Sequence, residues 1–472
     1  MSGTITINST DLINAVKPQL LQMPEITLQP CSYIIYTDGR NYCAKNGSTG
    51  EIEYYDTDAS NVIQYAINNV DVSGGGKVFI KSGTYPITKT IDPKSNIIIE
   101  GEGWNTVLQY ALSNPNPVIE GYNVSKVVLK NFVVDGMDIN SGEKDLIHFA
   151  HSSYIRIEGL EIRNKKGTHN GDAIDMDDVT YFWVLNNYIH DIDGGGIHPS
   201  NADSPPYYGS CKGVIAYNIL INTNRVANKA PIHVSGDSTL TGATPPQDII
   251  IIGNYIDTSP DYGIFIQSLK ISIIGNIIKN VGTGIMVSPF GSTASEAIDI
   301  IGNIIESTTA SHGIVLYAST SGLVKKVSIV GNSIRNAYKS GIQLTSATET
   351  TIVANNVYNP GWGSFQDAPG TSKYIVAFNI FEKYIVTQQS PRIVRGNIGY
   401  LTENSGVAKI SAGSTSVTVS HGLATTPSKV LITPLGQPQG KLWVENITST
   451  SFNIATDTAP TVDLNVAWYA EV

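Results

Sequence analysis

A repeated phrase limits the fold of this chain more than any other feature of its sequence. A run of Ile or Val is followed by Gly-Asn and another apolar pair at residues 251–256, 273–278, 300–305 and 329–334. Related asparagines continue the series at steps of 18 to 36 residues, namely Asn187, Asn218, Asn356, Asn379 and Asn397. Two short strands and two turns per repeat are typical of one coil of a parallel β-helix, where stacking buries the apolar side chains that a single coil leaves exposed.

The regular position of these asparagines separates this fold from a β-sandwich, the other all-β alternative. A sandwich predicts hairpin turns and no fixed position for asparagine. Asparagine tolerates the left-handed conformation of a turn and hydrogen-bonds to an identical side chain stacked upon it. We therefore expect Asn254, Asn276, Asn303 and Asn332 to stack in one column at one turn.

An entry segment precedes the repeats. Asp58 is expected to cap a helix, whose apolar stripe is formed by Val62, Ile63, Ala66, Ile67 and Val70. A Gly-rich turn at 74–76, an apolar run at 77–80 and the triplet Gly-Thr-Tyr at 83–85 follow. This order resembles the opening of the pectate-lyase superfamily, and the likeness extends over residues 58–400. The resemblance implies a right-handed parallel β-helix of the pectin-lyase type, with the helix capping the open end of the column.

Three regions are predicted along the chain. Residues 1–57 form an attachment or oligomerisation segment with a hairpin around 37–40. Residues 58–402 form the β-helix. Residues 403–472 form a small β-sandwich, because apolar and polar residues alternate there with a period of two. This last region resembles C-terminal modules of virus tail proteins.

The composition of the chain limits the classes of binding partner and the location that we expect. A net charge of -10 argues against nucleic acid, since phosphate contacts need clustered Lys and Arg. No apolar run is long enough for membrane insertion, and residues 1–30 carry no recognisable signal peptide. We expect the protein outside the cell or on a virion surface. Cys31, Cys43 and Cys211 show no metal-binding spacing, and free thiols are favoured over a Cys31–Cys43 pair.

Alternation within each coil predicts a file of ionisable side chains. Five isoleucines align as inward positions, namely Ile147, Ile174, Ile197, Ile232 and Ile264. The next residue on each coil points outward, which gives an exposed ladder of His148, Asp175, His198 and His233. Adjacent strands lie about 4.8 Å apart, so these side chains are expected to share one groove.

The same region is rich in titratable residues and long loops. Six of the eight histidines lie between His148 and His233. Insertions at 201–211, with Tyr207 and Tyr208, and at 236–247 are expected to cover the groove. Asp172, Asp191 and Asp193 on the neighbouring turn are further site candidates, and Lys229 and Arg225 are candidates for binding a carboxylate. Asp177 and Asp178 are expected to occupy an exposed turn.

Two local patterns resemble carbohydrate-active families. Residues 187–191 and 196–199 resemble alginate C5-epimerases, although His198 stands at that family's aspartate position and Ser200 at its histidine position. Residues 170–175 and 191–195 resemble the aspartate motifs of polygalacturonase-like hydrolases. That family's later His-Gly and Arg-x-Lys motifs are absent here.

Three functions remain open from the sequence. The first is an enzyme that cleaves or modifies a uronate-containing polysaccharide. As a lyase or epimerase it would use His198 or His233 as the base, and as a hydrolase it would pair Asp172 or Asp175 with Asp193. The second is a non-catalytic, homotrimeric protein that resembles a tailspike and binds a glycan or receptor. The third is a divalent metal held by three residues of the ladder, although no cofactor is required by the first two.

Overall fold

The structure is a computed structural model that describes residues 31–472, except 169–170, 203–204, 206, 227–228, 321–322, 384, 387–388, 390–391 and 400. The described chain is nearly all β and forms about 11 solenoid turns. It divides into two compact units, Met1–Ile298 and Asp299–Val472. No described helix is long and apolar enough to cross a membrane. The all-β parallel β-helix with an N-terminal cap helix is therefore confirmed.

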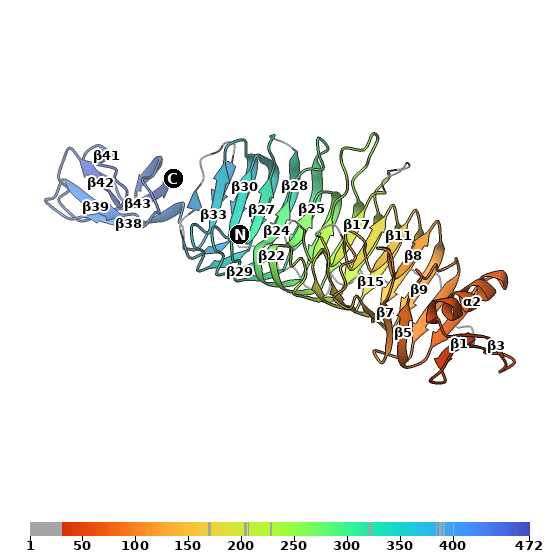
Figure 1. Cartoon of the computed structure of the whole chain (residues 1–472). Coiled ribbons are helices and arrows are strands. Elements are labelled where there is room, and N and C mark those ends of the chain that lie inside the picture. The colour runs from red at the N-terminus through yellow and green to blue at the C-terminus, as the bar shows by residue number, and fades with distance from the viewer. Residues whose placement is uncertain are drawn as a thin grey trace. The chain divides into compact units, whose positions relative to one another are not determined.

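Three columns of parallel strands build the first unit (Figure 1). The first column contains β4 (Gly76–Ile80), β6 (Ile97–Gly101), β9 (Ser125–Lys130), β12 (Ser153–Glu158), β15 (Thr180–Leu185), β18 (Cys211–Ala216), β21 (Gln247–Ile252) and β23 (Leu269–Ile274). The second contains β5 (Gly83–Ile87), β7 (Thr106–Tyr110), β10 (Val133–Asp135), β13 (Glu161–Lys165), β16 (Tyr188–Ile192) and β19 (Ile219–Ile221).

The third column carries the candidate site. It contains β8 (Ile119–Tyr122), β11 (Ile147–Ala150), β14 (Ile174–Asp177), β17 (Ile197–Ser200) and β20 (Ile232–Val234). The long strands β22 (Tyr255–Ile266) and β24 (Ile277–Val287) continue the second column with their first halves and the third with their second halves. Inward side chains alternate with outward ones along each strand.

A helix covers one end of this unit. The helix α2 (Ala59–Val72) begins after Asp58, whose side chain accepts a hydrogen bond of 2.9 Å from the Ser60 backbone N–H. This is the expected N-cap. Val62, Ile63, Ala66, Ile67 and Val70 are buried against the first strands.

The N-terminal hairpin extends the first column. The strand β2 (Tyr42–Asn46) pairs antiparallel with both β1 (Cys31–Thr37) and β3 (Ile52–Asp56), and β1 pairs in parallel with β4. Cys31, Cys43 and Cys211 are free thiols. The attachment role of residues 1–57 remains a prediction, and residues 1–30 lie outside the described part.

Asparagine ladders run through each unit. In the first unit, the Asn187 amide donates to Asn218, Asn218 to Asn254 and Asn254 to Asn276, each at 2.9 Å. In the second unit, hydrogen bonds of 2.9–3.0 Å join Asn303, Asn332, Asn355, Asn379 and Asn397 in that order.

Two details of the asparagine prediction are wrong. The third asparagine of the ladder in the second unit is Asn355 rather than Asn356, which begins the following strand. The left-handed residue is the one before each asparagine, such as Gly253 with φ 65° or Ala354 with φ 58°. The preceding residue makes the turn, and this leaves the asparagine side chain free to join the ladder.

The second unit also contains stacked coils and a separate pair of sheets. Its parallel strands are β26 (Ile304–Glu306), β27 (Ile314–Tyr317), β28 (Val324–Val330), β29 (Ser333–Arg335), β30 (Ile342–Thr345), β31 (Ala347–Val353), β32 (Asn356–Tyr358), β33 (Phe365–Ala368), β34 (Ser372–Ala377), β35 (Ile380–Phe381), β36 (Ile385–Val386) and β37 (Arg392–Arg395). β25 (Ser295–Ile301) contains the boundary between the units.

Two three-stranded antiparallel sheets follow the coils of the second unit. They are formed by β38 (Glu403–Ile410), β43 (Leu464–Glu471) and β40 (Lys429–Pro434), and by β39 (Ser416–Ser420), β42 (Ser451–Thr456) and β41 (Leu442–Glu445). Apolar side chains of both sheets, among them Phe452, Ile454 and Val466, form one buried cluster.

Candidate functional site

The four residues of the predicted ladder lie in register on neighbouring strands. His148 on β11 pairs with Asp175 on β14, and Asp175 pairs with His198 on β17. His233 on β20 comes next, because the isoleucines before His198 and His233 are paired. All of these preceding isoleucines are completely buried inside the column. The alignment of the coils by sequence is therefore confirmed.

The expected exposure of the ladder is wrong for His198 and His233, which are each only 8% exposed. Both side chains leave the column, but other side chains cover them. Lys229 Nζ lies 3.3 Å from His198 Nδ1, and Ser235 Oγ lies 2.8 Å from His233 Nε2. Phe265 packs edge-on against His233, with 4.8 Å between the ring centres. Alternation along a strand shows which side chains leave the column, but not what later segments place over them.

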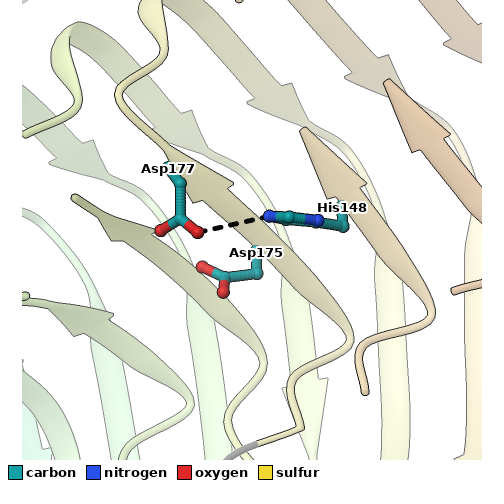
Figure 2. Close-up of side chains that lie close together, drawn as sticks. All are labelled: His148, Asp175 and Asp177. Atoms are coloured by element: carbon teal, nitrogen blue, oxygen red, sulfur yellow. Dashed lines mark hydrogen bonds and ion pairs between the residues drawn. The ribbon is translucent and has the colours of Figure 1, made fainter. Parts of the chain in front are cut away.

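The other end of the ladder is more open. Asp175 and Asp177 both project outward from β14, and His148 lies beside them on β11 (Figure 2). His148 Nε2 lies 3.2 Å from Asp177 Oδ2, and His148 Nδ1 lies 3.3 Å from Glu120 Oε1. All four side chains are partly exposed. The expectation of an exposed turn is wrong for Asp177, because it ends a strand and faces the ladder.

Charges shift the pKa values at this open end. Burial, followed by the negative charge of Asp175, raises the pKa of Asp177 to about 6 against the opposing effect of His148. Burial lowers the pKa of His148, but its hydrogen bonds with Asp177 and Glu120 outweigh burial and raise that pKa to about 11. The site therefore holds an imidazolium at neutral pH and a carboxyl group that titrates near pH 6.

A buried ionic network lies beside the covered histidines. Asp172 is completely buried, and its Oδ2 lies 2.9 Å from His198 Nδ1 and 2.7 Å from Lys229 Nζ. Its Oδ1 accepts a hydrogen bond of 2.7 Å from the Gly195 backbone N–H. The second ladder carboxylate, Asp175, places Oδ1 3.3 Å from His198 Nδ1. Lys229 therefore neutralises an aspartate of the chain itself rather than facing solvent.

This network also shifts pKa values. Burial raises the pKa of Asp172, but Lys229 and His198 outweigh it and hold the pKa below the usual range. Burial and Lys229 lower the pKa of His198, yet the charges of Asp175 and Asp172 raise it to about 9. Burial, with His198 and Lys229, lowers the pKa of His233 well below its usual value. His233 is therefore neutral at neutral pH.

Other predicted residues form a separate cluster after β16. Arg225 Nε lies 2.8 Å from Asp193 Oδ1, and Asp193 Oδ2 accepts from the Gly167 backbone N–H at 2.9 Å. Asp191 is bonded to His190 and Asn222. No described contact joins Asp193 to Asp172 or Asp175, and their pairing as hydrolytic carboxylates, which needs a separation of about 5–9.5 Å, stays a prediction.

The two insertions contact each other. The Thr244 backbone N–H donates to the Tyr207 carbonyl at 2.8 Å, and the Thr244 hydroxyl donates to the Tyr208 carbonyl. Asp178, also predicted in an exposed turn, is buried and accepts from the Gly209 backbone N–H at 2.9 Å. Tyr208 is 66% exposed and lacks any described contact with the ladder.

Three residues that matter to this geometry were not among the predicted site residues. Glu120 follows the buried Ile119 and pairs with His148, so it points outward as His148 does. Extending the alignment of coils to the preceding one would have found it. Asp177 lies two residues after Asp175 on the same face of β14. Ser235 lies in the segment after β20, where strand alternation gives no guidance.

Two trios are spaced closely enough to hold a cation. The ligand atoms of His148, Asp175 and Asp177 all lie within 4.8 Å of one another, as do those of Asp172, Asp175 and His198. In the second trio the ammonium of Lys229 already occupies one Asp172 oxygen. The first trio is the better candidate for a metal, since His and carboxylate ligands suit divalent transition ions.

Family models match two overlapping parts of the chain. A model described as rhamnogalacturonase A/epimerase, pectate lyase-like, matches residues 47–231, and one described as right handed beta helix region matches residues 207–357. The first match contains all residues of the open end. A search of curated proteins found no significant match.

Solved structures with similar folds share little sequence. A DFA-IIIase from Arthrobacter chlorophenolicus A6, in complex with DFA-III, is 12% identical with a TM-score of 0.56 and covers 72% of this chain and 95% of its own. The tailspike of Escherichia coli bacteriophage HK620, in complex with a hexasaccharide, is 12% identical with a TM-score of 0.55 and covers 98% and 100%. The mannuronan C-5 epimerase AlgE6 A-module of Azotobacter vinelandii is 16% identical with a TM-score of 0.47 and covers 72% and 95%.

Proposed function

We propose that this chain, which belongs to the right-handed parallel β-helix superfamily, hydrolyses a polysaccharide with Asp175 and Asp177 as its catalytic carboxyl groups. The observation that carries this proposal is the arrangement of two carboxyl groups on one outward face of β14, with oxygen atoms within 4.8 Å. Glycosidases of the retaining type place their carboxyl groups about 5–5.5 Å apart, whereas inverting enzymes need about 6.5–9.5 Å. The close spacing favours a retaining hydrolase.

The two carboxyl groups differ in their surroundings as such a mechanism requires. The raised pKa of Asp177, about 6, suits a group that gives its proton to the glycosidic oxygen. Asp175 faces the His198 imidazole at 3.3 Å and would attack the anomeric carbon as a carboxylate. Water would then release the sugar from Asp175 while Asp177 takes the proton back. His148 keeps Asp177 oriented through the contact with Nε2.

The similar folds support a carbohydrate substrate without identifying it. One of them is a DFA-IIIase in complex with DFA-III, and another is a tailspike in complex with a hexasaccharide. The His148 imidazolium is already paired with Glu120 and Asp177, so its charge does not by itself select a sugar that carries a carboxylate. The match to a pectate lyase-like family model makes a uronate-containing chain the first substrate class to test, beside neutral polysaccharides.

Incubation with a polysaccharide panel tests the proposal. Hydrolysis produces new reducing ends without an unsaturated product, and the first product should keep the configuration of the substrate at the anomeric carbon. Asp175→Asn and Asp177→Asn should each reduce turnover about 100- to 10,000-fold. Asp248→Asn, at an exposed surface pair with Lys270, serves as the matched control and should retain full turnover.

A second candidate function is binding without turnover. It is favoured by the tailspike match, which extends over 98% of this chain. On this alternative the protein is a homotrimer on a virion or cell surface that holds a host glycan on the same face. If the wild type binds a glycan without forming product and has a trimeric mass in solution, the hydrolysis proposal is wrong and this binding function is favoured. An unsaturated product would instead identify a lyase.

A further inference from the structure

Ser235 lies between two imidazoles next to the buried Asp172. Its Oγ is 2.8 Å from His233 Nε2 and 3.5 Å from His198 Nε2. On the other side of the His198 ring, Nδ1 lies 2.9 Å from Asp172 Oδ2. A hydroxyl, an imidazole and a buried carboxylate thus make successive contacts through the two nitrogens of one ring. This is the order of contacts that activates serine as a nucleophile in unrelated hydrolase folds.

We propose that Ser235, His198 and Asp172 form a second catalytic centre, which hydrolyses small acyl esters. Asp172 accepts the Nδ1 hydrogen of His198 and so leaves the Nε2 lone pair directed at Ser235. Lys229 Nζ lies 2.7 Å from Asp172 Oδ2 and 3.3 Å from His198 Nδ1, and we assign its hydrogen bond to the closer carboxylate oxygen rather than to the ring nitrogen. The carboxylate therefore holds His198 in the tautomer that can take a proton from serine.

The second imidazole orients the serine. We assign the proton of neutral His233 to Nε2, so that it donates to the Ser235 oxygen at 2.8 Å and leaves the hydroxyl hydrogen free to point at His198. His233 Nδ1 has no hydrogen-bond partner among the residues that the structure describes, so no carboxylate accepts a hydrogen bond from this ring as Asp172 does from His198. His198 is therefore assigned as the base and His233 as a positioning residue.

The chemistry balances with water as the only other reactant. The Ser235 oxygen attacks the ester carbonyl carbon, and its proton passes to His198 Nε2. The bond between the acyl carbon and the alcohol oxygen breaks, and the alcohol leaves with that proton. Water then attacks the acyl group on Ser235 with His198 as base, which releases the acid and restores the hydroxyl.

The surroundings indicate a small acyl group on a sugar. Ser235 is only 5% exposed, which excludes a bulky acyl chain in this arrangement. Asp175 contacts the same His198 ring, so a glycan bound at Asp175 brings its acylated hydroxyls close to Ser235. The choice of a sugar ester rests on the proposed polysaccharide function, whereas ester hydrolysis by Ser235 does not.

Labelling and ester hydrolysis test the centre independently of any polysaccharide. Methanesulfonyl fluoride, a serine-directed probe small enough for this covered site, should label the wild type at Ser235, located by peptide mass spectrometry, and p-nitrophenyl acetate should be hydrolysed. Ser235→Ala, His198→Ala and Asp172→Asn should each lose at least about 100-fold in rate. The control Ser153→Ala, at a partly exposed serine on β12, should be unaffected. A smaller loss in His233→Ala than in His198→Ala identifies His198 as the base.

The pH dependence gives a further readout. The charged and titratable groups that act on His198 are Asp172, Asp175, Lys229, His233 and, from the open end, Asp177. Since His198 must be neutral to accept a proton and its pKa is raised to about 9, the ester rate should increase with pH up to about 9.

Two results would overturn the proposal: no label on Ser235 of the folded wild type, or an ester rate that Ser235→Ala leaves unchanged. The first measurement needs no variant, so a folding defect in a variant cannot obscure the outcome. Ser235→Ala should retain polysaccharide hydrolysis, and Asp177→Asn should retain ester hydrolysis. Failure of one proposal is therefore distinguishable from failure of the other.

Discussion

The imidazole of His148 bridges two carboxyl groups, with Nε2 3.2 Å from Asp177 Oδ2 and Nδ1 3.3 Å from Glu120 Oε1. These three residues come from β14, β11 and β8, which are successive strands of one column. The relationship places a cation between two acidic groups on the outward face. The His148 cation lowers the pKa of Asp177, although burial and the charge of Asp175 outweigh it.

Polysaccharide hydrolysis should decline as the pH rises through about 6, because Asp177 must be protonated to act as the acid. His148→Gln removes a group that lowers the pKa of Asp177. The declining limb of the rate profile should therefore move upward by about 1 pH unit. His190→Gln, in the separate cluster with Glu161 and Asp191, is the control and should leave the limb in place. If the limb does not move in His148→Gln, a group other than Asp177 gives the proton to the glycosidic oxygen.

Lys229→Met should lower the free energy of unfolding by about 3–5 kcal/mol, because it leaves the buried Asp172 carboxylate without its ammonium partner. The deficit should shrink as the pH falls and Asp172 becomes protonated. Lys270→Met breaks an exposed pair with Asp248 and should cost less than about 1 kcal/mol. Denaturant unfolding of the three proteins at several pH values measures both effects. Equal costs for the two variants would contradict a structural role for Lys229.

Asn355→Ala should destabilise the second unit by about 2–4 kcal/mol, because several buried backbone and amide groups lose their partners. The Asn355 amide donates to Asn379 at 3.0 Å, and its oxygen accepts from the Asn332 amide at 2.9 Å. Its neighbour Asn356 lies outside the ladder, and Asn356→Ala should change stability by less than about 0.5 kcal/mol. Thermal unfolding compares the two. A larger loss of stability in Asn356→Ala than in Asn355→Ala would place Asn356, not Asn355, in the asparagine ladder.

Chelation should leave polysaccharide turnover unchanged. The His148 imidazolium and the Lys229 ammonium already place positive charge beside carboxylates of the two candidate trios, and the proposed hydrolysis uses no metal. Turnover measured before and after exhaustive treatment with EDTA tests this prediction. Loss of turnover that Zn²⁺, Mn²⁺ or Ca²⁺ restores would instead place a metal at His148, Asp175 and Asp177.

The architecture was predictable because it depends on short-range periodicity. Side chains next to the inward Ile174 and Ile197 must point out of the column, because inward and outward positions alternate along a strand. Stacking of similar coils then gives paired residues on neighbouring strands the same orientation. The order of His148, Asp175, His198 and His233 followed from this rule alone. The asparagine ladder followed for the same reason, apart from the shift from Asn356 to Asn355.

The chemistry of the site was decided by contacts between segments far apart in the sequence. Lys229 reaches Asp172 across 57 positions, and Ser235 reaches His198 across 37. The segments that carry Lys229 and Ser235 do not repeat, so no periodicity predicts where they fold. The sequence by itself determined which residues face outward and in what order. Only the tertiary structure decided which of them are covered and charged, because burial and pKa depend on neighbours brought together by folding.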